Sequence, residues 1–269
     1  MKIESKKITV PILIKMKQKG EKIAALTAYD FLSAALLDES GMDLILVGDS
    51  LAMVFAGHET TIPITMDEMI YHTKIVRRGV KRALFVADLP FLSYQISPEE
   101  AMRNAGRLMK EGGAEAVKME GGEPIAATVK KLVQVGIPVM GHLGLTPQSI
   151  HKFGGYVTQG KKELDAQRLL KDAQILEQAG AFSIVLEKIP AKLGREISES
   201  LTIPTIGIGG GNGCDGQIVV TADMLGFFEK FKPKFVRRYA EIGNTMREAF
   251  NGYIRDVKNG SFPDESESF

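Results

Sequence analysis

Short apolar runs alternate with longer amphipathic stretches along most of the 269-residue chain. A run that is apolar at nearly every position is typical of a parallel strand covered on both faces, whereas an apolar stripe at helical spacing is typical of a packed helix. Alternation of the two predicts repeated strand-helix units. We expect eight strands, over residues 23–27, 44–47, 84–87, 116–119, 138–141, 182–186, 205–208 and 218–220.

Two of the intervening helices are marked by their sequence, one over 98–110 and one over 163–177. Ser97 suits the N-cap of the first, and Pro98 suits its first helical position. Eight such units predict an α/β fold of the closed (β/α)8 kind, a TIM barrel. An open doubly wound sheet is the alternative, because strand order cannot be inferred from one sequence.

No low-complexity tract or charge block divides the chain. We therefore predict a single TIM-barrel domain over residues 1–269. Within it, residues 1–22 form a helical N-terminal extension, and residues from about 258 to 269 form a mobile acidic tail.

The amino-acid composition limits the classes of molecule that the protein is expected to bind. The chain has 34 lysines and arginines against 33 acidic residues, a net charge of +1, which gives no broad attraction to nucleic acid or an anionic membrane. The single cysteine, Cys214, cannot form an internal disulfide, and the first residues lead into no long apolar segment. We expect a cytoplasmic protein with no nucleic-acid or membrane partner, in which any charged ligand is held locally.

Acidic residues stand where several apolar runs end: Asp49, Asp88, Glu120 and Glu187. The carboxyl ends of the strands of an α/β barrel meet at one face, so we expect these side chains to converge. Magnesium prefers oxygen ligands and usually takes one or two carboxylates, which makes Asp49 and Asp88 the first candidates. Taken alone, an aspartate after a strand is more often a helix cap or turn residue.

Other polar residues lie beside these acids. Lys118 and Glu120 are two apart on one strand, so both side chains face the same way and are suited to an anionic substrate, or to a structural ion pair. Glu187 is a candidate general base, or else a solvated loop acid. His142 follows an apolar run between glycines and can donate to a ligand oxygen, although a lone histidine is more often structural.

A glycine-rich segment runs from Ile206 to Gln217. Its backbone amides are suited to an anion or a flat ligand. It does not open a helix and does not end in Gly-Lys-Ser/Thr, so it is a weak candidate for a nucleotide-phosphate site.

Several segments, taken in order, resemble the ketopantoate hydroxymethyltransferase family. They are Val47-Gly-Asp-Ser, Gly57-His, Tyr71-His-Thr, Ala87-Asp-Leu-Pro-Phe, Val117-Lys-Met-Glu-Gly-Gly, Gly141-His-Leu-Gly-Leu-Thr-Pro-Gln, Leu186-Glu and Gly207-Ile-Gly-Gly-Gly-Asn-Gly-Cys-Asp-Gly-Gln. The resemblance covers most of the chain and continues to Phe235-Val-Arg-Arg-Tyr. Two positions depart from it, since the family commonly has alanine at Gly210 and Lys188 is unexpected after Glu187.

This resemblance implies a magnesium-dependent enzyme of pantothenate synthesis. A one-carbon unit passes from 5,10-methylenetetrahydrofolate to 3-methyl-2-oxobutanoate (α-ketoisovalerate) through a metal-stabilised enolate, giving ketopantoate and tetrahydrofolate. It also implies a homo-oligomer, a decamer in the family. The implied metal ligands are Asp49, Asp88 and Glu120, the implied general base is Glu187, and the implied substrate contacts are Asp49, Ser50, Asp88, Lys118 and His142.

Two other functions are compatible with these residues. Magnesium-dependent lyases of the phosphoenolpyruvate mutase and isocitrate lyase type also use acids at the strand ends of a barrel. A non-catalytic sensor would bind a metal and a keto acid without exchanging the substrate proton. The separate base candidate, Glu187, argues against the sensor.

Overall fold

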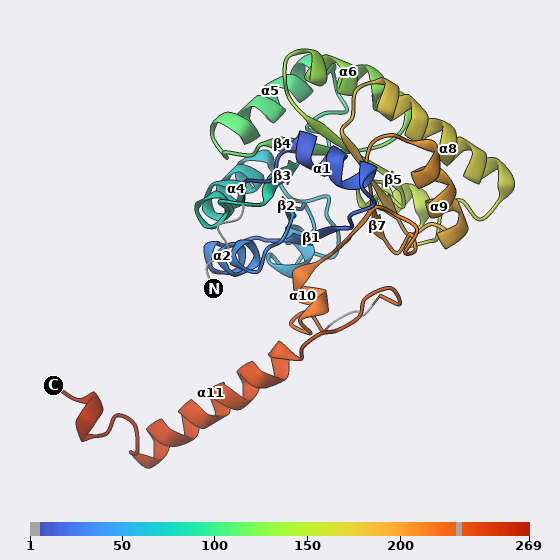
Figure 1. Cartoon of the computed structure of the whole chain (residues 1–269). Coiled ribbons are helices and arrows are strands. Elements are labelled where there is room, and N and C mark those ends of the chain that lie inside the picture. The colour runs from blue at the N-terminus through green and yellow to red at the C-terminus, as the bar shows by residue number, and fades with distance from the viewer. Residues whose placement is uncertain (1–5, 230–232) are drawn as a thin grey trace. The chain divides into compact units, whose positions relative to one another are not determined.

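The computed structural model describes residues 6–229 and 233–269 (Figure 1). The chain divides into two compact units, residues 1–219 and 220–269. The first unit contains a closed barrel of eight parallel strands in chain order, closed by pairing of the first strand with the eighth. The predicted TIM barrel is confirmed, and the open sheet is excluded. The boundaries that we gave for one domain, its extension and its tail stay a prediction.

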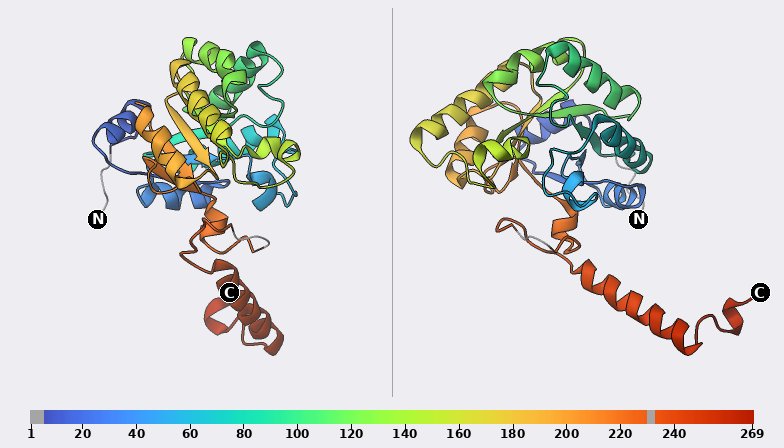
Figure 2. Two further views of the ribbon diagram at one scale, coloured as in Figure 1. Left: turned by 90° about the vertical axis from the view of Figure 1, so that its right-hand side faces the viewer. Right: turned by 180° about the vertical axis from the view of Figure 1, so that it is seen from behind.

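The elements of the first unit alternate as the sequence pattern predicts. Its strands are β1 (Ile23–Thr27), β2 (Leu44–Val47), β3 (Leu84–Asp88), β4 (Ala116–Glu120), β5 (Val139–Gly144), β6 (Ser183–Glu187), β7 (Thr205–Ile208) and β8 (Gly216–Val219). Its helices are α1 (Val10–Gln18), α2 (Phe31–Glu39), α3 (Leu51–Val54), α4 (Met66–Gly79), α5 (Pro98–Lys110), α6 (Ala126–Gln134), α7 (Ile150–Phe153), α8 (Glu163–Gln178) and α9 (Ala191–Ser200), with 3-10 turns η1 (Glu123–Ile125) and η2 (Pro147–Ser149). Helices surround the strands in all three views (Figures 1 and 2).

Several strands differ from prediction at their ends. β3, β4 and β6 each run one residue further, so Asp88, Glu120 and Glu187 belong to the strands rather than to the loops after them. β5 continues through His142 to Gly144, and β8 starts two residues earlier, at Gly216. The apolar run is a poor guide to a strand end in a barrel, because a polar side chain can face the barrel axis while its backbone stays in the ladder.

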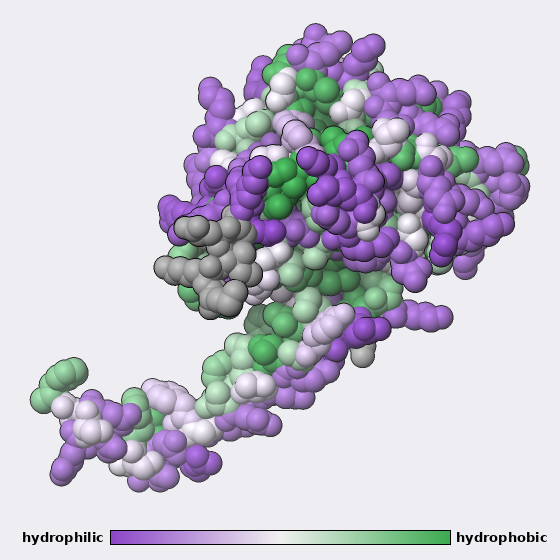
Figure 3. Space-filling view, in the orientation of Figure 1, coloured by the Kyte–Doolittle hydropathy of each residue, from purple (hydrophilic) through white to green (hydrophobic). Residues whose placement is uncertain are grey.

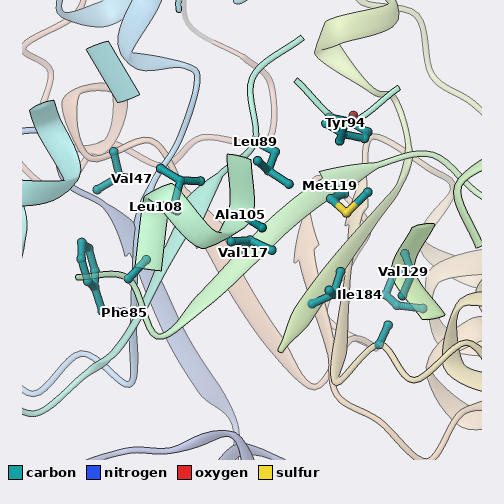
Figure 4. Packing of buried hydrophobic residues seen from close by; sticks show 14 of the residues in the cluster. Val47, Phe85, Leu89, Tyr94, Ala105, Leu108, Val117, Met119, Val129 and Ile184 are labelled. Atoms are coloured by element: carbon teal, nitrogen blue, oxygen red, sulfur yellow. The ribbon is translucent and has the colours of Figure 1, made fainter. Parts of the chain in front are cut away.

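Successive strand residues belong to two separate buried clusters. On β4, Val117 and Met119 pack in the cluster between strands and helices, whereas Ala116 belongs to the cluster inside the barrel. Figure 4 shows part of the outer cluster, with Val117 and Met119 among its labelled members. Since side chains alternate along a strand, Lys118 and Glu120 face the barrel axis.

α1 lies at the end of the barrel where the strands begin. Leu13 is fully buried and joins the inner cluster together with Ile8. The backbone N–H of Ile8 donates to Arg82 O, two residues before β3 (2.7 Å), and Lys17 forms an ion pair with Asp215, just before β8 (2.9 Å). The opposite end, where the strands finish, is left for polar side chains.

β7 and β8 are joined by residues 209–215, all of which the structure describes and none of which is helical. This glycine-rich turn packs tightly against its surroundings. A Cβ on Gly211 (φ +87°) would lie 2.5 Å from Ala191 Cβ, and one on Gly210 would lie 2.9 Å from Leu186 O. The alanine common in the family at Gly210 would therefore need a local shift of the backbone here.

The second unit contains α10 (Thr221–Met224), α11 (Ile242–Asn259) and a 3-10 turn, η3 (Glu265–Glu267). Exposed apolar side chains lie along α11, among them Phe250, Tyr253 and Ile254, and the helix shows apolar surface in Figure 3. None of the helices in the described ranges is long and apolar enough to cross a membrane.

Candidate active site

Five of the predicted site residues lie on four consecutive strands at the end of the barrel away from α1. Asp88 ends β3, Lys118 and Glu120 lie on β4, His142 lies on β5 and Glu187 ends β6. Asp88 is the register partner of Lys118, and Glu120 is the register partner of His142. All five are at most 9% exposed. The barrel brings together residues that lie up to 99 positions apart in the sequence, from Asp88 to Glu187.

A continuous line of short contacts joins these side chains. Lys118 Nζ lies 3.1 Å from Asp88 Oδ1, 3.9 Å from Glu120 Oε1 and 3.1 Å from His142 Nδ1. An ammonium group can only donate, so His142 Nδ1 accepts and its Nε2 carries the proton. His142 Nε2 in turn lies 3.3 Å from Glu187 Oε2. Lys118 is therefore the positive centre of a largely acidic group.

Burial shifts the pKa values of these groups. Burial, and then the neighbouring Asp88, raise the pKa of Asp49 to about 7, and burial raises the pKa of Glu187 to about 7. Burial opposes the charge on Lys118, but the carboxylates around it outweigh burial and raise its pKa. Burial and Lys118 lower the pKa of His142 well below its usual value, so the imidazole is neutral at pH 7.

The carboxylates at this end of the barrel are suited to a divalent cation. Asp88 Oδ1 and Glu120 Oε1 are buried, and both face the ammonium of Lys118 without a further hydrogen-bond donor in the structure. Across residues 6–229 and 233–269, no three His, Cys, Asp or Glu side chains form a ready-made metal cage. Magnesium commonly binds one or two carboxylates and completes its shell with water and substrate oxygens. The residues present fit such an open site, with Asp49 beside it.

Asp49 lies in the turn after β2, and Gln148, which the sequence reasoning missed, holds its side chain. Gln148 Nε2 donates to Asp49 Oδ2 (2.9 Å) and to Leu89 O (3.0 Å). The backbone N–H of Gln148 donates to Glu120 Oε2 (3.0 Å). One residue thus ties two of the predicted metal ligands together. Gln148 ends the motif Gly141-His-Leu-Gly-Leu-Thr-Pro-Gln, but the motif does not name its partners, because the path of the chain beyond β5 is a tertiary property.

Tyrosines support the same groups, and the sequence reasoning missed these too. Tyr94 OH lies 2.7 Å from Gln148 Oε1, and the backbone N–H of Glu120 donates to the Tyr94 hydroxyl (3.1 Å). Tyr29 OH lies 2.8 Å from Ser50 Oγ. Ser50 follows Asp49 in the turn after β2, and Tyr29 is the partner that fixes its hydroxyl.

Lys188 adopts a left-handed backbone (φ +48°), which is unfavourable for a residue with a side chain. Its backbone N–H donates to Ile208 O (2.8 Å), and its carbonyl accepts from Gln159 N (3.0 Å). Its ammonium donates to the carbonyl of Tyr156. This unexpected residue therefore anchors the loop before α8.

Known proteins resemble the chain over nearly its whole length. The profile of a family described as ketopantoate hydroxymethyltransferase matches residues 7–265. A protein of Syntrophus aciditrophicus (strain SB) named 3-methyl-2-oxobutanoate hydroxymethyltransferase is 57% identical, over 99% of this chain and 98% of its own. A protein of the same name from Thermoanaerobacter sp. (strain X514) is also 57% identical, over 98% of this chain and 96% of its own.

Solved structures of lower identity share the fold. A phosphonopyruvate hydrolase in complex with oxalate and Mg²⁺ aligns with a TM-score of 0.63 and 14% identity, over 97% of this chain and 93% of that one. A 2,3-dimethylmalate lyase of the PEP mutase/isocitrate lyase superfamily aligns with a TM-score of 0.60 and 15% identity, over 96% and 91%. At these identities the likeness establishes the barrel fold alone.

Proposed function

The chain belongs to the ketopantoate hydroxymethyltransferase family, and from that premise we propose that it transfers a hydroxymethyl group from 5,10-methylenetetrahydrofolate to 3-methyl-2-oxobutanoate. The family resemblance of the sequence motifs is confirmed by relatives at 57% identity. The products are ketopantoate and tetrahydrofolate. The reaction belongs to pantothenate synthesis, and we propose a cytoplasmic setting for it.

One structural observation supports this proposal most. Asp88, Lys118, Glu120, His142 and Glu187 form a buried line of contacts across four adjacent strands. Such a line places a positive centre, a neutral hydrogen-bond donor and a carboxylate of raised pKa side by side. These are the parts needed to bind a keto acid and remove a proton next to its ketone.

Asp49, Asp88 and Glu120 are the residues that we propose to hold a divalent cation, magnesium in our proposal. When bound, the cation supplies positive charge beside the ketone and so favours loss of the neighbouring proton. Gln148 orients two of these carboxylates through the bonds that it makes to Asp49 and Glu120. A fixed ligand set lowers the reorganisation needed on binding.

Lys118 and His142 are suited to the acceptor substrate. The ammonium of Lys118 is held charged by its carboxylate neighbours and can pair with the carboxylate of the keto acid. The Nε2–H of neutral His142 can donate to an acceptor oxygen without adding charge to the site. Ser50, fixed by Tyr29, supplies a further hydroxyl.

Glu187 is the proposed general base. Its pKa near 7 means that the carboxylate form is abundant at neutral pH and still accepts a proton readily. Glu187 takes the proton from the carbon next to the ketone, and that carbon forms the new bond to the donated carbon. Both bonds between the donated carbon and the two folate nitrogens break, and water supplies the hydroxyl group. The two nitrogens take up the second water proton and the proton that Glu187 removed.

Proton NMR in heavy water tests the proposal. We expect loss of the methine signal of 3-methyl-2-oxobutanoate with protein and Mg²⁺, and ketopantoate only when methylenetetrahydrofolate is added. Exchange without any ketopantoate would favour the lyase alternative instead. No exchange under either condition would leave the keto acid unsupported as substrate.

A further inference from the structure

One loop reaches from one side of the strand ends to the other. It consists of residues 154–160, between α7 and α8, and is called the mouth strap here. Tyr156 OH lies 3.2 Å from Met53 Sδ on α3, which follows β2. The carbonyl of Tyr156 accepts from Lys188, which follows β6. In a closed barrel of eight strands in chain order, β2 and β6 are four strands apart and so lie on opposite sides.

The strap therefore passes over the groups at the ends of these two strands. Asp49 follows β2 and Glu187 ends β6. Burial, and then the charges of Glu187 and Asp49, raise the pKa of the Tyr156 phenol. Both carboxylates are thus near enough to act on one ring, as expected for a side chain that covers the space between them.

Two glycines begin the strap, and the two side chains after them are partly exposed. Gly154 (φ +70°) and Gly155 (φ +137°) have backbone angles that suit only glycine, and an added Cβ at either would meet nothing within 4 Å. Tyr156 is 38% exposed and Val157 is 50% exposed. The Tyr156 hydroxyl contacts Met53 Sδ, and the Tyr156 carbonyl accepts from Lys188.

The side from which the second substrate arrives follows from this cover. In the proposed function Lys118, His142 and Glu187 hold the acceptor among the strand ends, so the second substrate must arrive from the open side. Its donated carbon must come within about 3–3.5 Å of the acceptor carbon for the bond to form. The second substrate must therefore meet Tyr156 or displace it.

We propose that the phenol ring of Tyr156 is one wall of the site for the one-carbon donor and stacks on the donor's flat heteroaromatic ring. Lys188 holds the backbone of the wall, because its ammonium donates to the carbonyl of Tyr156. This inference rests on the proposed function. It adds a residue for the donor site, to which the sequence motifs assign none.

Three variants of the full-length protein test it: Tyr156→Ala, Tyr156→Phe, and Val157→Ala as a matched control from the same strap. We expect Tyr156→Ala to raise the KM for methylenetetrahydrofolate about tenfold, the effect of losing one aromatic stacking contact. Tyr156→Phe keeps the ring and is expected to stay within about twofold of wild type, as is Val157→Ala.

Exchange of the keto-acid proton in heavy water without donor separates a donor site from a general defect. We expect Tyr156→Ala to change this exchange by less than about threefold at about pH 8.5, where Glu187 is ionised with or without the ring above it, because the acceptor groups keep their own contacts. An unchanged donor KM in Tyr156→Ala would overturn the inference. So would a donor KM in Tyr156→Phe as high as in Tyr156→Ala, since the ring would then not be the contact. Ketopantoate formation by the wild-type protein tests the function independently.

Discussion

Burial sets the pH range in which Glu187 can act as a base. The side chain ends β6 inside the barrel mouth, and its pKa is raised to about 7 by loss of contact with water. A base must be ionised to accept a proton. Raising the pKa therefore makes the carboxylate a stronger base but moves the onset of activity upward in pH.

We predict that keto-acid proton exchange rises with pH and levels off above about pH 7, because only the ionised Glu187 accepts the proton. Glu187→Gln should lower exchange about 10²–10⁴-fold while leaving binding of the keto acid largely intact. Exchange rates by NMR from about pH 5.5 to 8.5 check both points. Glu199→Gln, at an exposed position on α9, is the control. A normal exchange rate in Glu187→Gln would remove Glu187 from the mechanism.

Gln148 is a second single residue on which the site depends, because it orients the carboxylates of Asp49 and Glu120. Its amide donates to Asp49 and its backbone N–H donates to Glu120, so its loss should leave both carboxylates less well oriented. We predict that Gln148→Leu weakens binding of Mn²⁺, used as a paramagnetic probe, about 10–100-fold. Electron paramagnetic resonance titration of the protein measures this without turnover.

The control for that prediction is Gln167→Leu, which removes an exposed amide on α8. Equal Mn²⁺ affinity in Gln148→Leu and wild type would show that the hydrogen bonds to Asp49 and Glu120 do not orient a metal site. A lower affinity in both variants would also count against a specific role for Gln148.

At the scale of elements, the contact between α2 and α4 depends on one small residue. Gly79 ends α4, and a Cβ there would lie 2.7 Å from Ala35 N and 2.8 Å from Phe31 O. Backbone atoms of α2 cannot yield as a flexible side chain can. The two helices can approach this closely only because the position has no side chain.

We predict that Gly79→Ala lowers the free energy of unfolding by about 1–3 kcal/mol, as overpacking does. Gly106→Ala is the matched control, since Gly106 lies within α5 and an added Cβ would meet nothing within 4 Å. That variant should gain about 0.5–1 kcal/mol from the better helix propensity of alanine. Urea unfolding of both variants checks the opposite signs, and two changes of the same sign would contradict the packing argument.

For the barrel as a whole, α1 closes the end that the active groups do not occupy. Leu13 packs within the inner cluster and has no solvent-exposed surface. The sequence predicts a helical extension here, and the structure shows what it covers. Sealing one end matters because the inner cluster would otherwise meet water.

We predict that Leu13→Ala lowers the free energy of unfolding by about 2–5 kcal/mol through loss of burial and the cavity left behind. Lys15→Ala, an exposed position on the same helix, should change it by less than about 0.5 kcal/mol. Chemical unfolding gives the two values. A small effect of Leu13→Ala would mean that α1 is not an integral cover of the barrel.

The predicted homo-oligomer, a decamer by resemblance, stays a prediction.

The sequence alone determined the strand count, the alternation of strands with helices and the candidate acids, because a strand buried on both faces must be apolar over most of its length and an acid that interrupts such a run stands out. Motifs in order along the chain were enough to identify the family. These are local properties, in which each residue type reports its own surroundings.

Only the tertiary structure decided which polar residues meet. Asp88, Glu120 and Glu187 are strand residues that face the axis, as the register of neighbouring strands shows. The contacts of Gln148 and Tyr156 follow from the paths of two connecting segments. A glutamine or tyrosine in a loop has the same sequence signature whether it faces solvent or a carboxylate. Its partner is fixed by closure of the barrel, which brings distant segments together.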